Sequence, residues 1–164
     1  MNKEVRLAFY RAAKGTWTDW LIAGYTWLFN MKAPLYSHVE IGFDIDGEWR
    51  YFSSSIRDNG TRWKRANDVL RNPDKWDIYS KEYPVDHVER MISRCVKIMG
   101  KQYDKLGIFG FVTVTGMVAN KKDHWYCSEA CFYVLTSFWK KRISPMRFWG
   151  RIKDDFKPIK GEER

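Results

Sequence analysis

Two short runs of alternating side chains, joined by a turn, constrain the fold of this chain more than any other stretch. In residues 37–43 the alternation places His38, Glu40 and Gly42 on one face of a strand, and Val39, Ile41 and Phe43 on the other. Residues 44–47, Asp-Ile-Asp-Gly, have the composition of a tight turn, and residues 48–55 return as a second strand. The sequence therefore predicts a β-hairpin over residues 37–55.

Further elements follow from the same kind of pattern. Strands are predicted over residues 5–10, 61–64 and 74–79, and a Trp-rich amphipathic helix over residues 16–30. A second helix is predicted over residues 86–100, with Asp86 as N-cap, Glu89 in a capping box and Gly100 at its end. Cys95 lies in the apolar stripe of that helix and is interpreted as a core residue. Residues 33–36 read as a connector, 120–123 as a charged loop, and the basic tail from residue 142 is expected to wrap the surface with Phe148 and Trp149 packed down.

Size and composition favour one globular domain over residues 1–164. Hydrophobic residues make up 45% of the chain and aromatic residues 17%. The net charge of +9 is equally compatible with an anionic partner and with solubility alone, because Lys and Arg are scattered. Three cysteines do not make a disulfide framework. The N-terminus lacks the apolar segment of a signal peptide, and the weakly polar run 106–119 is too short to span a bilayer, so a cytoplasmic location without membrane insertion is expected.

The stretch 125–135, Trp-Tyr-Cys-Ser-Glu-Ala-Cys-Phe-Tyr-Val-Leu, predicts a mostly buried helix with Cys127 at or just before its first turn. The first turn of a helix presents unpaired backbone N–H groups and the positive end of the helix dipole. This environment favours the nucleophilic thiolate of a cysteine placed there, and the same N–H groups are suited to hold an oxyanion. Cys127 is therefore the candidate catalytic nucleophile.

A cysteine nucleophile needs a base within hydrogen-bond reach, and three histidines are available. His38 is favoured because a strand fixes the direction of its ring, whereas His87 falls on the first turn of a helix. His124, three residues before Cys127, is the alternative base. His124, Cys127 and Cys131 also form an H-x2-C-x3-C pattern, but Cys131 is more simply a core residue of the helix, and no metal or other cofactor is assigned. No glycine-rich phosphate loop is present, and no motif supports nucleic-acid binding.

Four motifs together resemble a known family. They are Ser-His-Val-Glu-Ile at residues 37–41, the hairpin, Gly-Lys-Gln-Tyr-Asp at 100–104, and Tyr-Cys-Ser-Glu-Ala at 126–130. In this order they resemble the circularly permuted papain-like hydrolases, the YaeF/YiiX-type amidases of the NlpC superfamily, of which lecithin:retinol acyltransferase is a more distant relative. The matched span runs from about residue 16 to residue 135.

The resemblance implies an α+β permuted papain-like fold, in which an antiparallel sheet packs against the cysteine-bearing helix and additional helices. It makes Cys127 the nucleophile and His38 the general base. The family's third polar residue falls at residues 52–54, where Ser53 stands in place of the usual larger side chain. Glu40, on the same face as His38, is an alternative orienting residue, and it replaces the glycine that the family usually has two positions after the histidine.

The expected function is therefore that of a cysteine hydrolase cleaving an amide bond through a thioester, in peptidoglycan stem peptides or a related amide- or acyl-bearing substrate. An acyltransferase or thioesterase with the same two residues is the first alternative. The second is a catalytically degenerate binding module for a protein or nucleic-acid partner. A phage-encoded protein, or one exported without a classical signal, would reconcile a cell-wall substrate with the missing signal peptide. The sequence leaves the oligomeric state open.

Overall fold

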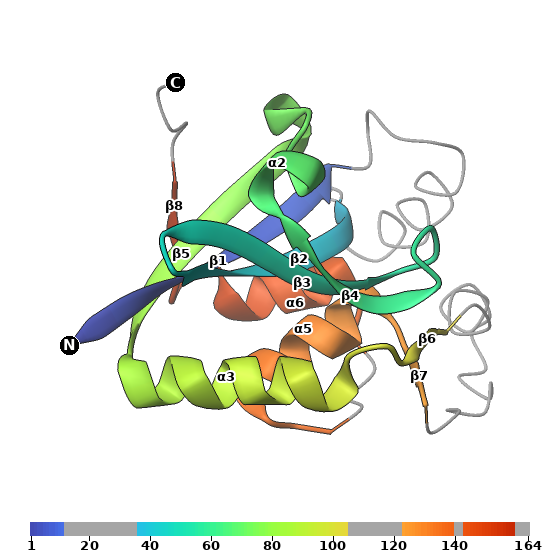
Figure 1. Ribbon diagram of the computed structural model, residues 1–164. Coiled ribbons are helices and arrows are strands. Elements are labelled where there is room, and N and C mark those ends of the chain that lie inside the picture. Colours follow the sequence, from blue (N-terminus) through green and yellow to red (C-terminus); the bar gives the residue numbers. More distant parts are fainter. Residues whose placement is uncertain (12–35, 105–122, 140–142, 160–164) are drawn as a thin grey trace.

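The computed structural model describes residues 1–11, 36–104, 123–139 and 143–159, and these form an α+β fold (Figure 1). The described α-helices are α2 (Ala66–Val69), α3 (Val85–Ile98), α5 (Cys127–Thr136) and α6 (Pro145–Ile152), with a 3-10 turn, η2 (Pro73–Lys75). The long strands are β1 (Asn2–Arg11), β2 (Tyr36–Ile45), β3 (Glu48–Ser55), β4 (Gly60–Arg65) and β5 (Trp76–Pro84). The short strands are β6 (Gln102–Tyr103), β7 (His124–Trp125) and β8 (Lys157–Pro158).

The eight described strands form one sheet in the order β7-β6-β4-β3-β2-β1-β5-β8. Neighbouring strands are antiparallel except β6 and β7, which are parallel. The β2–β3 hairpin closes through Asp46 and Gly47, whose φ angles of 56° and 80° match the two-residue turn that suits the twist of a hairpin. β2 thereby lies in the middle of the sheet, between β1 and β3.

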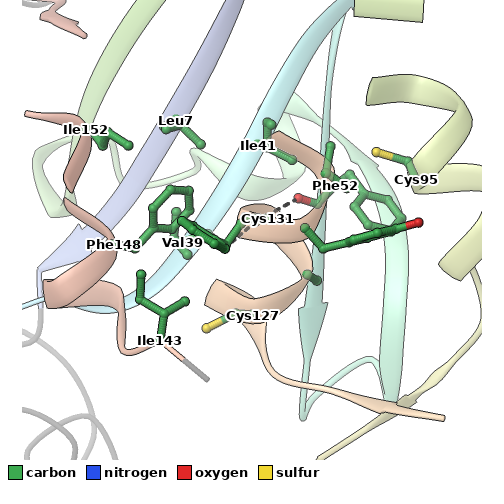
Figure 2. Packing of buried hydrophobic residues seen from close by; sticks show 14 of the residues in the cluster. Leu7, Val39, Ile41, Phe52, Cys95, Cys127, Cys131, Ile143, Phe148 and Ile152 are labelled. Atoms are coloured by element: carbon green, nitrogen blue, oxygen red, sulfur yellow. Dashed lines mark hydrogen bonds between the residues drawn. The ribbon is translucent and has the colours of Figure 1, made fainter. Parts of the chain in front are cut away.

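The hydrophobic core lies between one face of this sheet and the helices α3, α5 and α6 (Figure 1). Alternate residues of β1 and β2 point into it, as the period of a strand requires. Figure 2 shows Leu7, Val39 and Ile41 of these strands packed near α5 and α6. The fully buried side chains that the strands contribute include Val5, Leu7, Phe9, Tyr36, Val39, Ile41, Phe43 and Phe52.

A close backbone approach joins β4 to the segment after α3. Gly60 has φ of 149°, and a Cβ atom at this position would lie 2.0 Å from the carbonyl oxygen of Lys101. Only glycine fits there without displacing the backbone. The Thr61 N–H donates to the same carbonyl at 2.9 Å, so the chain leaving α3 is fastened to the edge of β4.

The predicted hairpin, the strands near residues 5–10 and 61–64, and the core position of Cys95 are confirmed. Phe148 is fully buried and Trp149 packs against the core, also as predicted. The strand predicted at residue 74 begins at Trp76, after η2, and continues to Pro84. The predictions for residues 16–30, 33–35, 106–119 and 120–122 lie outside the described residues.

The prediction that Asp86 caps α3 is wrong. The helix begins at Val85, directly after the strand residue Pro84, which occupies the N-cap position without a side-chain hydrogen bond. Asp86 is therefore already inside the first turn, where it forms an ion pair with Arg90 at 2.8 Å. The helix also ends earlier than predicted, at Ile98 rather than beside Gly100.

Among the described segments, no helix has the length and apolar character needed to cross a bilayer.

Replacement of Leu7 by Ala should test how much the shared core stabilises the fold. Leu7 is fully buried in β1, so truncation leaves a cavity and should lower the free energy of unfolding by about 2–5 kcal/mol. Val96→Ala is the control, since Val96 is 62% exposed on α3 and its truncation should change stability by less than about 0.5 kcal/mol. Urea denaturation measures both values. Equal losses for the two variants would contradict this assignment of the core.

Candidate active site

Cys127 is the first residue of α5, as the sequence predicted. Tyr126, at the N-cap, has extended backbone angles, and its N–H donates to Oε2 of Glu129 at 3.2 Å. This bond fixes the residue at which the helix begins. Figure 2 shows Cys127 at the N-terminal end of α5 next to Ile143, while Cys131 lies one turn further along the helix, in the core. The backbone N–H of Cys127 is therefore among the first-turn N–H groups that have no partner within the helix.

The other two cysteines have core environments. The Sγ atom of Cys131 lies 3.5 Å from the carbonyl oxygen of Val39 and 3.6 Å from that of Phe52 (Figure 2). Burial raises the pKa of both the Cys131 and the Cys95 thiols well above the ordinary value. Both are therefore held as neutral thiols, which are poor nucleophiles.

His38 lies near the start of β2 and connects the thiol to a carboxylate. The thiol of Cys127 is close enough to the imidazole for its charge and a hydrogen bond to raise the pKa of the ring. Its Nε2 atom lies 2.9 Å from Oε1 of Glu40, two residues along the same strand. Because one ring nitrogen is engaged by Glu40, Nδ1 is the atom left for the thiol. The ring of Trp76 lies near the imidazole, with 6.2 Å between the ring centroids and 71° between the ring planes.

The partners of His38 favour its charged form. Burial of the ring lowers its pKa, but the charge and hydrogen bond of Cys127, together with those of Glu40, outweigh this effect. The pKa of His38 is thereby raised to about 9. A protonated imidazole is the counter-ion that a cysteine thiolate needs in order to act as a nucleophile.

Glu40 is a buried carboxylate whose charge is compensated by Arg62. Its side chain is 2% exposed, and its two oxygens accept hydrogen bonds from Nη1 and Nη2 of Arg62 at 2.8 and 2.6 Å. Burial raises the pKa of Glu40, but the charge of Arg62 and the hydrogen bonds from His38 and Arg62 hold it at about 2. Glu40 is therefore ionised at neutral pH.

Arg62 is itself held by a second carboxylate. Its Nε atom donates to Oδ2 of Asp58 at 2.7 Å, and Lys64 donates to Oδ1 of the same side chain at 2.7 Å. Alternating charges thus run from His38 through Glu40, Arg62 and Asp58 to Lys64. The chain of contacts begins at the thiol and reaches the partly exposed edge of β4.

The two sequence candidates for a third residue occupy different positions. Glu40 contacts His38, whereas the Ser53 hydroxyl donates to the carbonyl oxygen of Val39 at 2.7 Å. Ser53 also lies 3.9 Å from Sγ of Cys131, and its described hydrogen bonds do not include His38. His124, the alternative base, lies on β7 paired with Gln102, whereas the histidine whose pKa Cys127 raises is His38.

Sequence reasoning missed Arg62 and Asp58. The stretch 61–64 predicted only a short strand, and nothing local marks one of its arginines as special. A signal was nevertheless present: Glu40 interrupts a strand whose neighbours are core residues, and a carboxylate near a core requires a cation. The cation, Arg62, lies on β4, the strand that follows the hairpin.

Within the described residues, no group of three or more His, Cys, Asp or Glu side chains is arranged to hold a metal ion. Cys131, the last position of the H-x2-C-x3-C pattern, is directed at backbone carbonyls in the core.

No protein-family model matches the chain, and a search among curated proteins found no match. A function for the chain therefore rests on its own residues and their geometry.

Replacement of Glu40 by Gln should lower the pKa of His38 by at least about one unit, because the charge that stabilises the imidazolium is lost. NMR titration of the imidazole measures this pKa. Glu48→Gln is the matched control, since Glu48 forms an exposed ion pair with Arg50 on β3. An unchanged His38 titration in the Glu40 variant would contradict the described contact.

The same shift makes a prediction for stability. The pKa of His38 is higher in the folded state than the ordinary value of 6.5, so its ionisation stabilises the fold fully below that pH. The contribution is lost as the pH rises through about 9. Urea denaturation at several pH values should show a smaller alkaline loss of unfolding free energy in Glu40→Gln than in the wild type.

Proposed function

We propose that the protein is a cysteine hydrolase that cleaves an amide bond, with Cys127 as nucleophile, His38 as general base and acid, and Glu40 as the residue that positions His38. The observation that carries this proposal is the grouping of a cysteine at a helix start, a histidine whose pKa that cysteine raises, and a buried, ionised carboxylate hydrogen-bonded to the histidine. The order of the two motifs along the chain, histidine strand before cysteine helix, supports a permuted papain-like arrangement. So does the packing of α5 against β2 and β3.

Each group has a defined part in the reaction. His38 holds the proton of Cys127, and the thiolate sulfur attacks the carbonyl carbon of the amide. The carbonyl oxygen becomes an oxyanion, which the backbone N–H of Cys127 at the helix start helps to stabilise. His38 then gives its proton to the leaving amine, and the C–N bond breaks to leave a thioester. Water, deprotonated by His38, attacks the thioester, releasing the acid and restoring the thiol.

The resemblance and the charge of the chain support the proposed substrate class. The family resemblance points to peptidoglycan stem peptides or a related amide, and a net charge of +9 suits an anionic polymer. The Cys127 side chain is 1% exposed, whereas that of His38 is 24% exposed. Substrate is therefore expected to approach from the His38 side, with displacement of side chains that cover the thiol.

Alkylation by iodoacetamide near neutral pH tests the nucleophile. Cys127 should be labelled before Cys95 and Cys131, since all three are buried and only a local activating charge separates them. His38→Ala should slow the labelling of Cys127 by at least about tenfold, because the base is removed. Intact mass over time and peptide mapping measure the rate and the site.

His87→Ala is the matched control, since His87 is an exposed histidine on α3. It should leave the rate unchanged. If Cys127 reacts no faster than the two core cysteines, or if both histidine variants behave alike, the nucleophile assignment fails. The degenerate binding module would then be the better description.

A substrate screen separates hydrolysis of amides from acyl transfer. The wild type and His38→Ala should be incubated with muropeptides and with acyl esters. Release of a free amine from muropeptides, absent in the variant, supports the amidase. Turnover of esters alone, or transfer of the acyl group to an added amine, would replace the amidase by the acyltransferase or thioesterase alternative.

A further inference from the structure

We propose that Arg62 is a positioning residue for the Cys127–His38 pair, which it serves by keeping the Glu40 carboxylate charged and fixed against the imidazole. This inference rests on the function proposed above and adds to it a residue on a different strand. Arg62 is not expected to touch substrate, because it acts through Glu40.

The geometry of the Glu40–Arg62 pair limits the freedom of the carboxylate. Both carboxylate oxygens are engaged, Oε2 by Nη1 at 2.8 Å and Oε1 by Nη2 at 2.6 Å. Oε1 is also the atom that lies 2.9 Å from Nε2 of His38. A carboxylate clamped by two parallel hydrogen bonds cannot rotate, so its contact with His38 is fixed in direction. A lysine would supply the charge without this fork.

Arg62 is held in place as firmly as it holds Glu40. Oδ2 of Asp58 accepts a hydrogen bond from Nε of Arg62 at 2.7 Å, and Oδ1 accepts one from Lys64. The Arg62 side chain is 17% exposed, so little water competes for its hydrogen bonds. Three nitrogens of the guanidinium are thus bonded to two carboxylates, and the group is oriented before substrate arrives.

The sheet order explains how Arg62 reaches its partner. Arg62 is on β4 and Glu40 on β2, with β3 between them. The residue paired with Arg62 on β3 is Ser53. Its short side chain is turned to the Val39 carbonyl, which leaves the way across β3 open for the long arginine. We assign Ser53 this permissive role rather than a bond to the imidazole.

The charged groups around the pair come from several elements. The groups that face Glu40 include Arg62 on β4, His38 on the same strand as Glu40, and the neutral Cys131 thiol on α5. His38 faces Glu40 and Cys127, with Trp76 of β5 at its edge. Without Arg62, burial would favour a protonated Glu40, which no longer stabilises the imidazolium. As the pH falls, the thiolate–imidazolium pair would then be lost at a higher pH than in the wild type.

The test is the pH profile of Cys127 alkylation, measured from about pH 4 to about pH 9 by intact mass with iodoacetamide. In Arg62→Met the acid-side midpoint should move to higher pH by at least about one unit. In Arg62→Lys the midpoint should lie between those of Arg62→Met and the wild type, because lysine returns the charge without the paired hydrogen bonds of the guanidinium. Arg50→Met is the matched control, since it removes an equal charge from an exposed ion pair on β3. Its profile should match the wild type.

A double-variant cycle asks whether Arg62 acts through Glu40. Adding Arg62→Met to Glu40→Gln should produce no further movement of the midpoint to higher pH, because the carboxylate it served is already absent. A further movement equal to that of the single Arg62 variant would overturn the proposal, as would a folded Arg62→Met with a wild-type profile.

Circular dichroism establishes folding of each variant. If Arg62→Met does not fold, the Arg62→Lys profile and the double variant, in which the buried charge is also removed, decide the question in the same way. The two proposals fail differently. A wild-type Cys127 that is unreactive or independent of His38 removes the proposed function, whereas a reactive, His38-dependent thiol that ignores Arg62 removes only the present inference.

Discussion

A carboxylate buried within a sheet is stable only if a cation meets it, and this constraint on Glu40 organises the site. Leaving one ion of such a pair unpaired typically costs about 3–5 kcal/mol, a large part of the stability of a small domain. The compensation comes from a neighbouring position on β2, His38, and from a strand two places away, Arg62 on β4. The hairpin and β4 must therefore be in register before the charge of Glu40 is tolerated.

The helix α5 shows how position alone separates two thiols of the same chemistry. Cys127 and Cys131 are four residues apart and so lie on the same side of the helix, one turn from each other. At the helix start, Cys127 contacts the side chain of His38, whereas one turn later Cys131 contacts backbone carbonyls of β2 and β3. The core around Cys131 is what anchors the helix, and the anchored helix is what carries Cys127 to His38.

The sequence was informative where alternating side chains, turn residues or a continuous apolar run marked an element. Alternation over residues 37–55 and the Asp-Gly turn predicted the hairpin correctly, and the apolar run after Cys127 predicted the start of α5. It failed at the cap of α3, where Pro84 ends a strand and leaves no room for a capping residue before the helix. It also missed Arg62, since a contact across an intervening strand depends on the register of three strands, which no single stretch of sequence encodes.

The long separation between the two halves of the site bears on when each half forms. The Glu40–Arg62 contact spans 22 residues, whereas the contact of Cys131 with Val39 spans 92. Contacts between distant residues are made late in folding because of the entropy of closing the loop between them. On a ribosome, the acid–base half of the site can assemble from the first part of the chain while α5 is still unmade. The nascent protein would thus hold a prepared histidine without a sulfur to activate, and reactivity would begin when α5 docks.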